Sequence, residues 1–146
     1  MRKISKKYLN HTQQEIEIYL AKFKKLVSLN YFFIPTNDKR VDNKKFIEKY
    51  HLTHNLQKKI LLSLQSSDFC YSVDNKNQAD ERLYVFSKKI ELDNWGKLEK
   101  ITIYFKITIK SDNYAVIISM HTLKKRIKKL FLRSDKYGKR ILRNLR

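Results

Sequence analysis

Cysteine, proline and glycine are all scarce in this chain of 146 residues, which contains one cysteine, one proline and two glycines. A single cysteine excludes an intrachain disulfide framework and suits a reducing compartment such as the cytoplasm. The shortage of glycine and proline excludes collagen-like and linker-rich architectures, and also the glycine-rich loops that cradle phosphates. We therefore expect a cytoplasmic protein without a nucleotide-binding loop.

Long apolar segments are also missing. The basic N-terminus is not followed by an apolar stretch, and the longest apolar run is far shorter than a bilayer span. No signal peptide and no membrane association are expected. The hydrophobic fraction of 42% is ordinary, and the length suits one domain over residues 1–146 with a single core.

Acidic residues are few, because 14 Asp and Glu stand against 33 Lys and Arg, a net charge of +19. A balance this basic indicates a polyanionic partner, since lysine and arginine side chains displace counterions from a phosphate backbone. RNA or DNA is the partner that this favours. An anionic membrane surface or an acidic protein remains an alternative.

After a basic arm over residues 1–11, the N-terminal half shows helical signals. Thr12 and Glu15 form a capping-box pair, and apolar residues then recur at helical spacing to about residue 29. Asp42 and Thr53 are expected to be the N-caps of two further short helices. Three helices are thus complete before any long strand begins.

The central stretch has the pattern of a β-hairpin. Apolar residues alternate with Thr102, Tyr104, Lys106 and Thr108 between residues 101 and 109, which is typical of a strand with one buried face. A turn at 111–113 leads to a nearly all-apolar second strand that ends on His121. Tyr104, Lys106 and His121 would then lie on adjacent strands, away from the core.

Two more strands precede this hairpin. Residues 69–73 predict a short strand, residues 74–81 a flexible polar loop, and residues 82–92 a strand that places Arg82, Tyr84, Phe86 and Lys88 on one face. A turn over residues 93–96 joins that strand to the hairpin.

The composition changes after His121. Residues 122–146 contain eleven Lys and Arg and one acid, and their apolar spacing predicts a basic amphipathic helix. The expected fold is therefore α+β, with N-terminal helices packed on one face of a small antiparallel sheet and a basic C-terminal helix. Residues 12–121 form its core.

Several chemistries lack the residues that they need. Cys70 stands alone, and His51 and His54 have no third ligand nearby, so no zinc site is expected. No carboxylate lies between Glu99 and Asp112 in the central strand, which argues against a two-metal nuclease. Cys70 fits a buried structural thiol better than a nucleophile. We expect neither a metal nor a cofactor.

The chemistry that remains is metal-free cleavage of RNA, in which the 2′-hydroxyl attacks its own phosphate. The protein then supplies a base, an acid and positive charge for the pentacovalent oxyanion. The candidate catalytic residues are His121 and Tyr104 for proton transfer and Lys106 for the charge. DNA lacks the 2′-hydroxyl and would be bound without being cut. The alternative is an ordinary half-solvated sheet face.

Four further residues are candidates for substrate binding. Arg82 and Lys88 supply positive charge for phosphates, and Tyr84 or Tyr71 can stack on a splayed base. All four stand on the two strands that precede the hairpin.

Five segments, in this order, resemble the MqsR (motility quorum-sensing regulator) family of toxins, mRNA-cleaving members of the RelE-like group. They are IEIYLAKFKKLV, ILLSLQSSDFCYS, ERLYVFSKKI, ITIYFKITI and VIISMH, and they span about residues 15–121. The resemblance implies a compact α/β toxin that cleaves mRNA without a metal and is neutralised by a cognate antitoxin.

By position, Tyr104 and Lys106 match the tyrosine and lysine of the family's V-Y-[LI]-K strand, and His121 falls where members carry lysine or histidine. Tyr71 stands where the pattern has lysine, and no glutamine occurs in residues 82–86, where the family places one. The resemblance therefore implies no particular cleavage sequence. The segment 122–146 lies beyond the usual end of the family.

The leading hypothesis is an endoribonuclease toxin that acts on free or ribosome-bound mRNA and is held in check by an antitoxin. The second is a non-catalytic nucleic-acid-binding regulator or inhibitor from a mobile element, which needs the charge but not His121. A third places the 122–133 segment on an anionic membrane or in a partner's groove.

Overall fold

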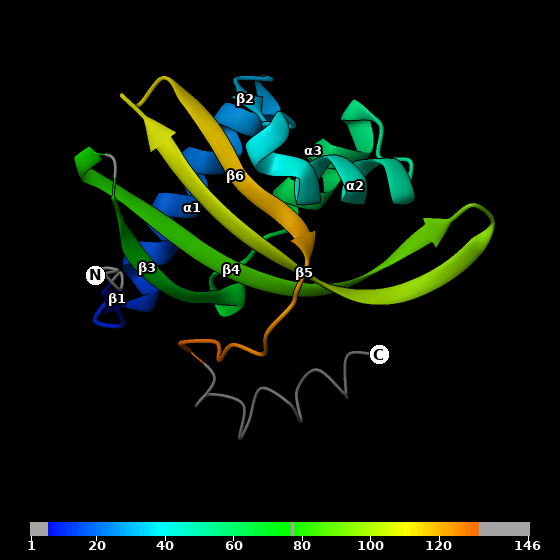
Figure 1. Cartoon of the computed structure of the whole chain (residues 1–146). Helices are drawn as coiled ribbons and strands as arrows, with labels where there is room; N and C mark the ends of the chain where they lie inside the picture. Colours follow the sequence, from blue (N-terminus) through cyan, green and yellow to red (C-terminus); the bar gives the residue numbers. More distant parts are fainter. Residues whose placement is uncertain (1–5, 77, 132–146) are drawn as a thin grey trace.

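The computed structural model describes residues 6–76 and 78–131, which form an α+β fold (Figure 1). The α-helices are α1 (Gln13–Ser28), α2 (Val41–Lys49) and α3 (His54–Leu62), and the 3₁₀ helices are η1 (Asp38–Arg40) and η2 (Ser66–Asp68). The strands are β1 (Lys7–Tyr8), β2 (Phe32–Phe33), β3 (Phe69–Asn75), β4 (Gln78–Asn94), β5 (Lys97–Lys110) and β6 (Tyr114–Thr122). Within the described part of the chain, no helix has the length and apolar character needed to cross a bilayer.

Two of the three predicted helix caps are confirmed. The backbone N–H of Glu15 donates to Thr12 Oγ1 at 3.1 Å, and Thr12 N–H donates to Glu15 Oε1 at 2.8 Å, which closes the capping box of α1. Thr53 Oγ1 accepts from Leu56 N–H at 3.3 Å and caps α3. The prediction for Asp42 is wrong: α2 already begins at Val41, and the Asp42 carboxylate contacts the ammonium of Lys124 instead.

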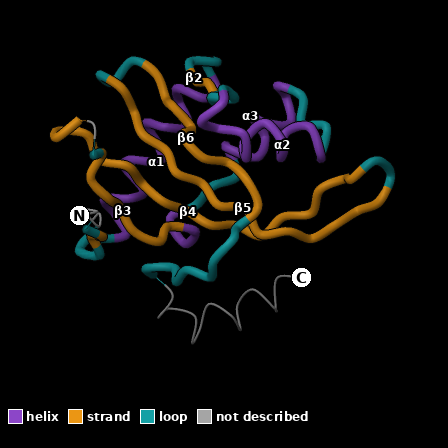
Figure 2. Tube along the Cα trace, in the orientation of Figure 1, coloured by secondary structure: helices purple, strands orange, loops and turns teal. Residues whose placement is uncertain are grey.

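The hydrophobic core lies between the three helices and one face of the sheet. The alternation predicted for β5 is confirmed, because Ile103, Phe105 and Ile107 are fully buried in the core that Phe23 and Leu61 of the helices also enter. Figure 2 shows the helices gathered behind the strands, while the opposite face of the sheet turns away from them. We call this opposite face the outer face.

The sheet has the strand order β1-β3-β4-β5-β6-β2. Its four long strands are antiparallel neighbours, but β2 runs parallel to β6 at the edge, so the expectation of a wholly antiparallel sheet is wrong there. The chain reaches this position after α1, and Ala115 N–H donates to the carbonyl of Tyr31 at 2.9 Å. At the other edge, β1 uses part of the predicted basic arm, of which residues 1–5 lie outside the described residues.

Both connections of β4 are tight. The predicted turn to β5 is confirmed: Asn94 pairs with Lys97, and the two residues between them, Trp95 and Gly96, have φ of 54° and 99°. This is the conformation that two-residue hairpin loops require. The loop predicted over residues 74–81 is wrong, because β3 continues to Asn75 and β4 begins at Gln78, so the strands occupy most of it.

The chain that follows β6 is irregular rather than helical. Residues 123–131 contain no helix, so the predicted amphipathic helix is wrong for this part, and its remainder, 132–146, lies outside the described residues. Tertiary contacts fix the segment: Leu130 N–H donates to the carbonyl of Phe69 at 2.8 Å, and the ring of Phe131 lies 6.2 Å from that of Phe69. In Figure 1 this orange segment passes from the end of β6 towards the start of β3.

Candidate active site

Strand register places four of the seven predicted site residues on the outer face. Tyr104 of β5 lies opposite His121 of β6, and Lys106 lies opposite Val85 of β4, which in turn pairs with Tyr71 of β3. Since alternate residues of a strand share a face, Tyr71, Tyr104, Lys106 and His121 all project from the same side of the sheet. The structure thus brings together all three residues predicted to be catalytic.

The rings of Tyr104 and His121 stack at a centroid distance of 5.4 Å and an angle of 27°. Nδ1 of His121 lies 3.0 Å from the carbonyl oxygen of Thr122. A carbonyl only accepts hydrogen bonds, so Nδ1 carries the proton and Nε2 is left with its lone pair. The backbone contact therefore holds the imidazole through Nδ1. Nε2, the nitrogen that can take up a proton, points away from that contact.

Tyr104 keeps its own proton. Burial raises the pKa of Tyr104 far above the ordinary value for tyrosine, and the neighbouring phenol of Tyr71, which also shares a hydrogen bond with it, raises this pKa further. A phenol in this state donates a hydrogen bond or a proton to a charged neighbour and does not act as a base. Of the two roles that the sequence allows Tyr104, the surroundings favour the donor.

Lys106 supplies positive charge without a counter-ion. Within the described residues no carboxylate contacts its ammonium group, and burial, with the nearby charges of Arg40 and Lys76, lowers its pKa. Arg40, which no pattern in the sequence singled out, reaches this neighbourhood from η1. A half-buried lysine beside an arginine is a favourable place for a phosphate oxyanion.

Two small cavities flank His121. One, of about 140 Å³, is lined by His121 and Ser119 and by two acids and two cations: Asp38, Asp42, Lys39 and Arg40. The other, of about 220 Å³, lies on the α2 side, where three lysines and Asp42 line it beside His121: Lys45, Lys49 and Lys124. The hollow on the α2 side is therefore the one with an excess of positive charge, and a polyanion can lie there beside the imidazole.

The other three predicted site residues lie on the helix side, and grouping them with His121 was wrong. Tyr84 is opposite Ile107, whose side chain is in the core, and its ring stacks on Tyr19 at 3.9 Å. The guanidinium of Arg82 sits 3.8 Å from the ring centroid of Tyr8. Strand β4 carries apolar residues on both faces, and only its register with β5 decides which face points to the core.

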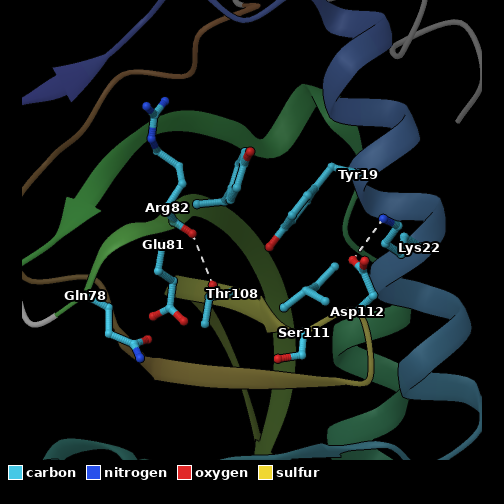
Figure 3. A pocket seen from close by; sticks show the side chains of 10 residues that line it. Tyr19, Lys22, Gln78, Glu81, Arg82, Thr108, Ser111 and Asp112 are labelled. Atoms are coloured by element: carbon cyan, nitrogen blue, oxygen red, sulfur yellow. Dashed lines mark hydrogen bonds and ion pairs between the residues drawn. The ribbon is translucent and has the colours of Figure 1, made fainter.

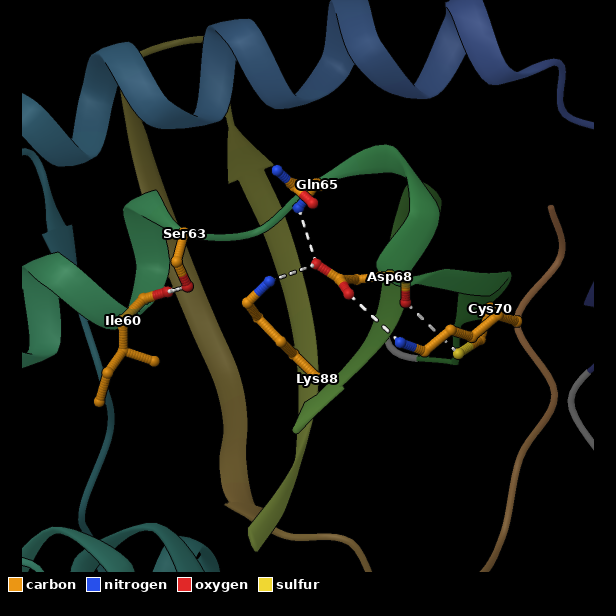
Figure 4. A network of polar contacts seen from close by, with 7 residues as sticks. Ile60, Ser63, Gln65, Asp68, Cys70 and Lys88 are labelled. Atoms are coloured by element: carbon orange, nitrogen blue, oxygen red, sulfur yellow. Dashed lines mark hydrogen bonds and ion pairs between the residues drawn. The ribbon is translucent and has the colours of Figure 1, made fainter. Parts of the chain in front are cut away.

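Lys88 belongs to a network around the buried carboxylate of Asp68 (Figure 4). The ammonium groups of Lys88 and Lys129 lie 3.2 and 3.3 Å from its oxygens, and Gln65 N–H donates to it at 2.9 Å. A buried charge is tolerated only when it is paired and hydrogen-bonded in this way. Lys88 therefore has a structural partner and is not available to a substrate.

Cys70, the only cysteine of the sequence, lies in an environment typical of a structural thiol. Cys70 is buried, and burial raises the pKa of its thiol, as expected for an unreactive thiol. Among the described residues, no three His, Cys, Asp or Glu side chains are grouped as metal ligands.

The outer face thus carries the catalytic candidates, while Arg82 and Tyr84 line a separate cavity on the helix side. Comparison of the chain with protein-family models and with curated proteins found no match.

Proposed function

We propose that this protein is a metal-independent endoribonuclease that cleaves mRNA, a RelE-like toxin of the MqsR kind. The observation that carries the proposal is the grouping on one sheet face of three groups: an imidazole with an uncommitted nitrogen, a phenol held in its protonated form, and an ammonium group that no carboxylate of the described residues contacts. These are the three elements that transesterification of RNA requires.

In the proposed reaction, His121 Nε2 takes the proton of the 2′-hydroxyl as the 2′-oxygen attacks phosphorus. The bond from phosphorus to the 5′-oxygen breaks, and the products are a 2′,3′-cyclic phosphate and a 5′-hydroxyl end. Tyr104 keeps its proton and donates a hydrogen bond to the departing 5′-oxygen or to a non-bridging oxygen, and the proton that His121 took up passes to the 5′-oxygen of the leaving group. Lys106, with Arg40 nearby, stabilises the charge on the pentacovalent phosphate.

The rest of the molecule supports RNA as the substrate. The net charge of +19 favours a phosphate backbone, and the hollow on the α2 side of His121, with three lysines and one aspartate, extends the site. The ring of Tyr71 presents a stacking surface on the same face, with the ammonium of Lys7 4.6 Å from its centroid. A cognate antitoxin, which the family resemblance implies, would have to neutralise or cover this charge.

The same charge favours a second candidate, a nucleic-acid-binding regulator without catalytic activity. That protein would bind RNA and DNA with a steep salt dependence and would not need His121. The two candidates therefore differ in whether products form.

The deciding experiment is induced expression in a bacterial host, followed by mapping of mRNA 5′ ends. Wild type, His121→Ala and the matched control His54→Ala, an exposed histidine stacked on Phe32, are compared. Growth arrest and new 5′ ends in wild type and control, both absent from His121→Ala, would support the ribonuclease. Absence of new ends in all three would replace it by the binding protein, and cleavage by His121→Ala would remove His121 from the mechanism.

A further inference from the structure

A larger cavity than the two beside His121, of about 490 Å³, opens on the helix side of the sheet between α1 and the ends of β4 and β5 (Figure 3). Tyr19 and Lys22 of α1 form one wall, Tyr84 of β4 and Ile109 of β5 contribute apolar surface, and Asp112 lies at the rim. It shares no residue with the site around His121. The size is within the range of small-molecule sites.

The hydroxyl group of Tyr19 has no partner. Its oxygen is buried, and it is the one buried side-chain polar atom in the described residues without a hydrogen bond. Figure 3 shows this oxygen pointing into the space between α1 and the sheet. The ring is fixed by its stacking on Tyr84 at 3.9 Å, and burial raises the pKa of the phenol far above the ordinary value. Such orphaned groups are rare in native proteins, and each needs an explanation.

The cations around this cavity are all neutralised by neighbouring acids. The two cations that line the cavity are Lys22, paired with Asp112 at 3.2 Å, and Arg82, paired with Asp74 at 3.6 Å. The carboxylate of Glu81, which also lines it, is paired with Lys110 at 2.6 Å. In a chain with a net charge of +19, this makes the cavity a locally neutral place. A phosphate gains little there, because each cation that it would meet already has a carboxylate beside it.

We propose that this cavity binds an uncharged nucleoside or the corresponding free nucleobase. A planar heterocycle can lie against Tyr84 and Ile109, accept a hydrogen bond from the Tyr19 hydroxyl, and so satisfy the one group that the fold leaves unpaired. Thr108, Ser111 and Gln78 at the wall and rim offer polar contacts to a ribose. The proposal does not depend on the ribonuclease activity.

Titration calorimetry of the full chain with adenosine, cytidine and uridine, and with their 5′-monophosphates, tests this proposal. We expect saturable binding of at least one nucleoside, with its monophosphate binding no more tightly. Tyr19→Phe should weaken binding by about tenfold or more. Tyr31→Phe, at an exposed tyrosine, and His121→Ala should bind as the wild type does.

Four results of these titrations would overturn the proposal. They are no nucleoside binding at about 10 mM ligand, unchanged binding in Tyr19→Phe, tighter binding of the monophosphate that disappears in Lys106→Ala, and loss of nucleoside binding in His121→Ala. The last two would place the ligand on the outer face.

The unliganded Tyr19→Phe variant gives a second and independent readout. Removing a buried hydroxyl that lacks a partner relieves a cost of folding, so the melting temperature should rise while nucleoside affinity falls. A lower melting temperature would mean that the hydroxyl has a structural partner, and the proposal would fail.

Discussion

The surroundings of Lys106 and the Tyr19 cavity differ in how positive charge is paired. On the outer face, Lys106 has no carboxylate contact among the described residues. On the helix side, the two cations that line the Tyr19 cavity, Lys22 and Arg82, contact acids at 3.2 and 3.6 Å. Both faces belong to one chain with a net charge of +19, so the total charge does not locate an anion site. The distribution of the few acids does, because a carboxylate cancels the attraction of its partner for phosphate.

The largest expected effect is a loss of RNA cleavage on the outer face that leaves ligand binding on the helix side unchanged. Tyr104→Phe should slow RNA cleavage by about 10²–10⁴-fold, since it removes a hydrogen-bond donor from the reacting centre, and should leave nucleoside binding in the Tyr19 cavity unchanged. Single-turnover cleavage of a labelled RNA measures the first effect and calorimetry the second. Tyr114→Phe, at an exposed tyrosine of β6, is the control. Cleavage at the wild-type rate would remove Tyr104 from the reaction.

A second comparison concerns a buried ion-pair network and an exposed ion pair. Asp68→Ala should destabilise the fold by about 3–5 kcal/mol, because it leaves the ammonium groups of Lys88 and Lys129 unpaired in a poorly solvated place. Asp112→Asn breaks an exposed pair with Lys22, keeps a residue type that tolerates the φ of 57° at this position, and should change the free energy of unfolding by less than about 0.5 kcal/mol. Urea unfolding of both variants measures the difference, and equal losses would contradict the assignment of Asp68 to a buried network.

The salt dependence of RNA binding distinguishes free from paired lysines. Lys106→Ala should lower the slope of log affinity against log salt by about one unit, which is the loss of one phosphate contact. Lys22→Ala removes a lysine that is paired with Asp112 and should leave this slope nearly unchanged. Fluorescence anisotropy with an uncleavable RNA over a range of salt concentrations tests the pair. An equal fall of the slope in the two variants would mean that the ion pair with Asp112 does not neutralise Lys22.

The smallest expected effect is a pH dependence. The pKa of Lys106 is lowered, so its ammonium group loses its proton at a lower pH than that of an ordinary lysine. The contribution of Lys106 to RNA binding should disappear at the pH where this proton is lost. The pKa of Lys106 is lower in the folded state than in the unfolded state. Between these two pKa values the unfolded chain binds more protons than the folded one, so the contribution of Lys106 to stability rises with pH. Binding and stability should therefore move in opposite directions. Lys106→Arg, which keeps its charge, should abolish both changes.

Periodicity was sufficient to predict the elements with a single buried face. In β5 the apolar residues fall on alternate positions only, and the structure buries Ile103, Phe105 and Ile107 as predicted. In β4 both sets of alternate residues are apolar, with Leu83 and Val85 on one face and Tyr84 and Phe86 on the other. The pattern is symmetric there, and the core side follows only from pairing with β5, which a single sequence does not reveal.

Tertiary contacts account for the other differences. Residues 123–131 have helical spacing, but the hydrogen bond from Leu130 to Phe69 and the contact of Lys129 with Asp68 hold them in an irregular conformation against the start of β3. Asp42 has the chemistry of a helix cap, but a lysine 82 residues further along the chain takes its carboxylate. Arg40 joins the neighbourhood of Lys106 only because η1 folds against β6, and no local pattern marks it.

The Asp68 network also has a consequence for protein synthesis. Lys129 is 61 residues further along the chain than Asp68, so this contact forms only after nearly all of the described chain has been translated. A product of premature termination that ends before Lys129 would keep the carboxylate but lack one of its two ammonium partners. Such truncated chains would unfold more readily than the complete protein, and the cell's quality-control proteases would degrade them in preference to it.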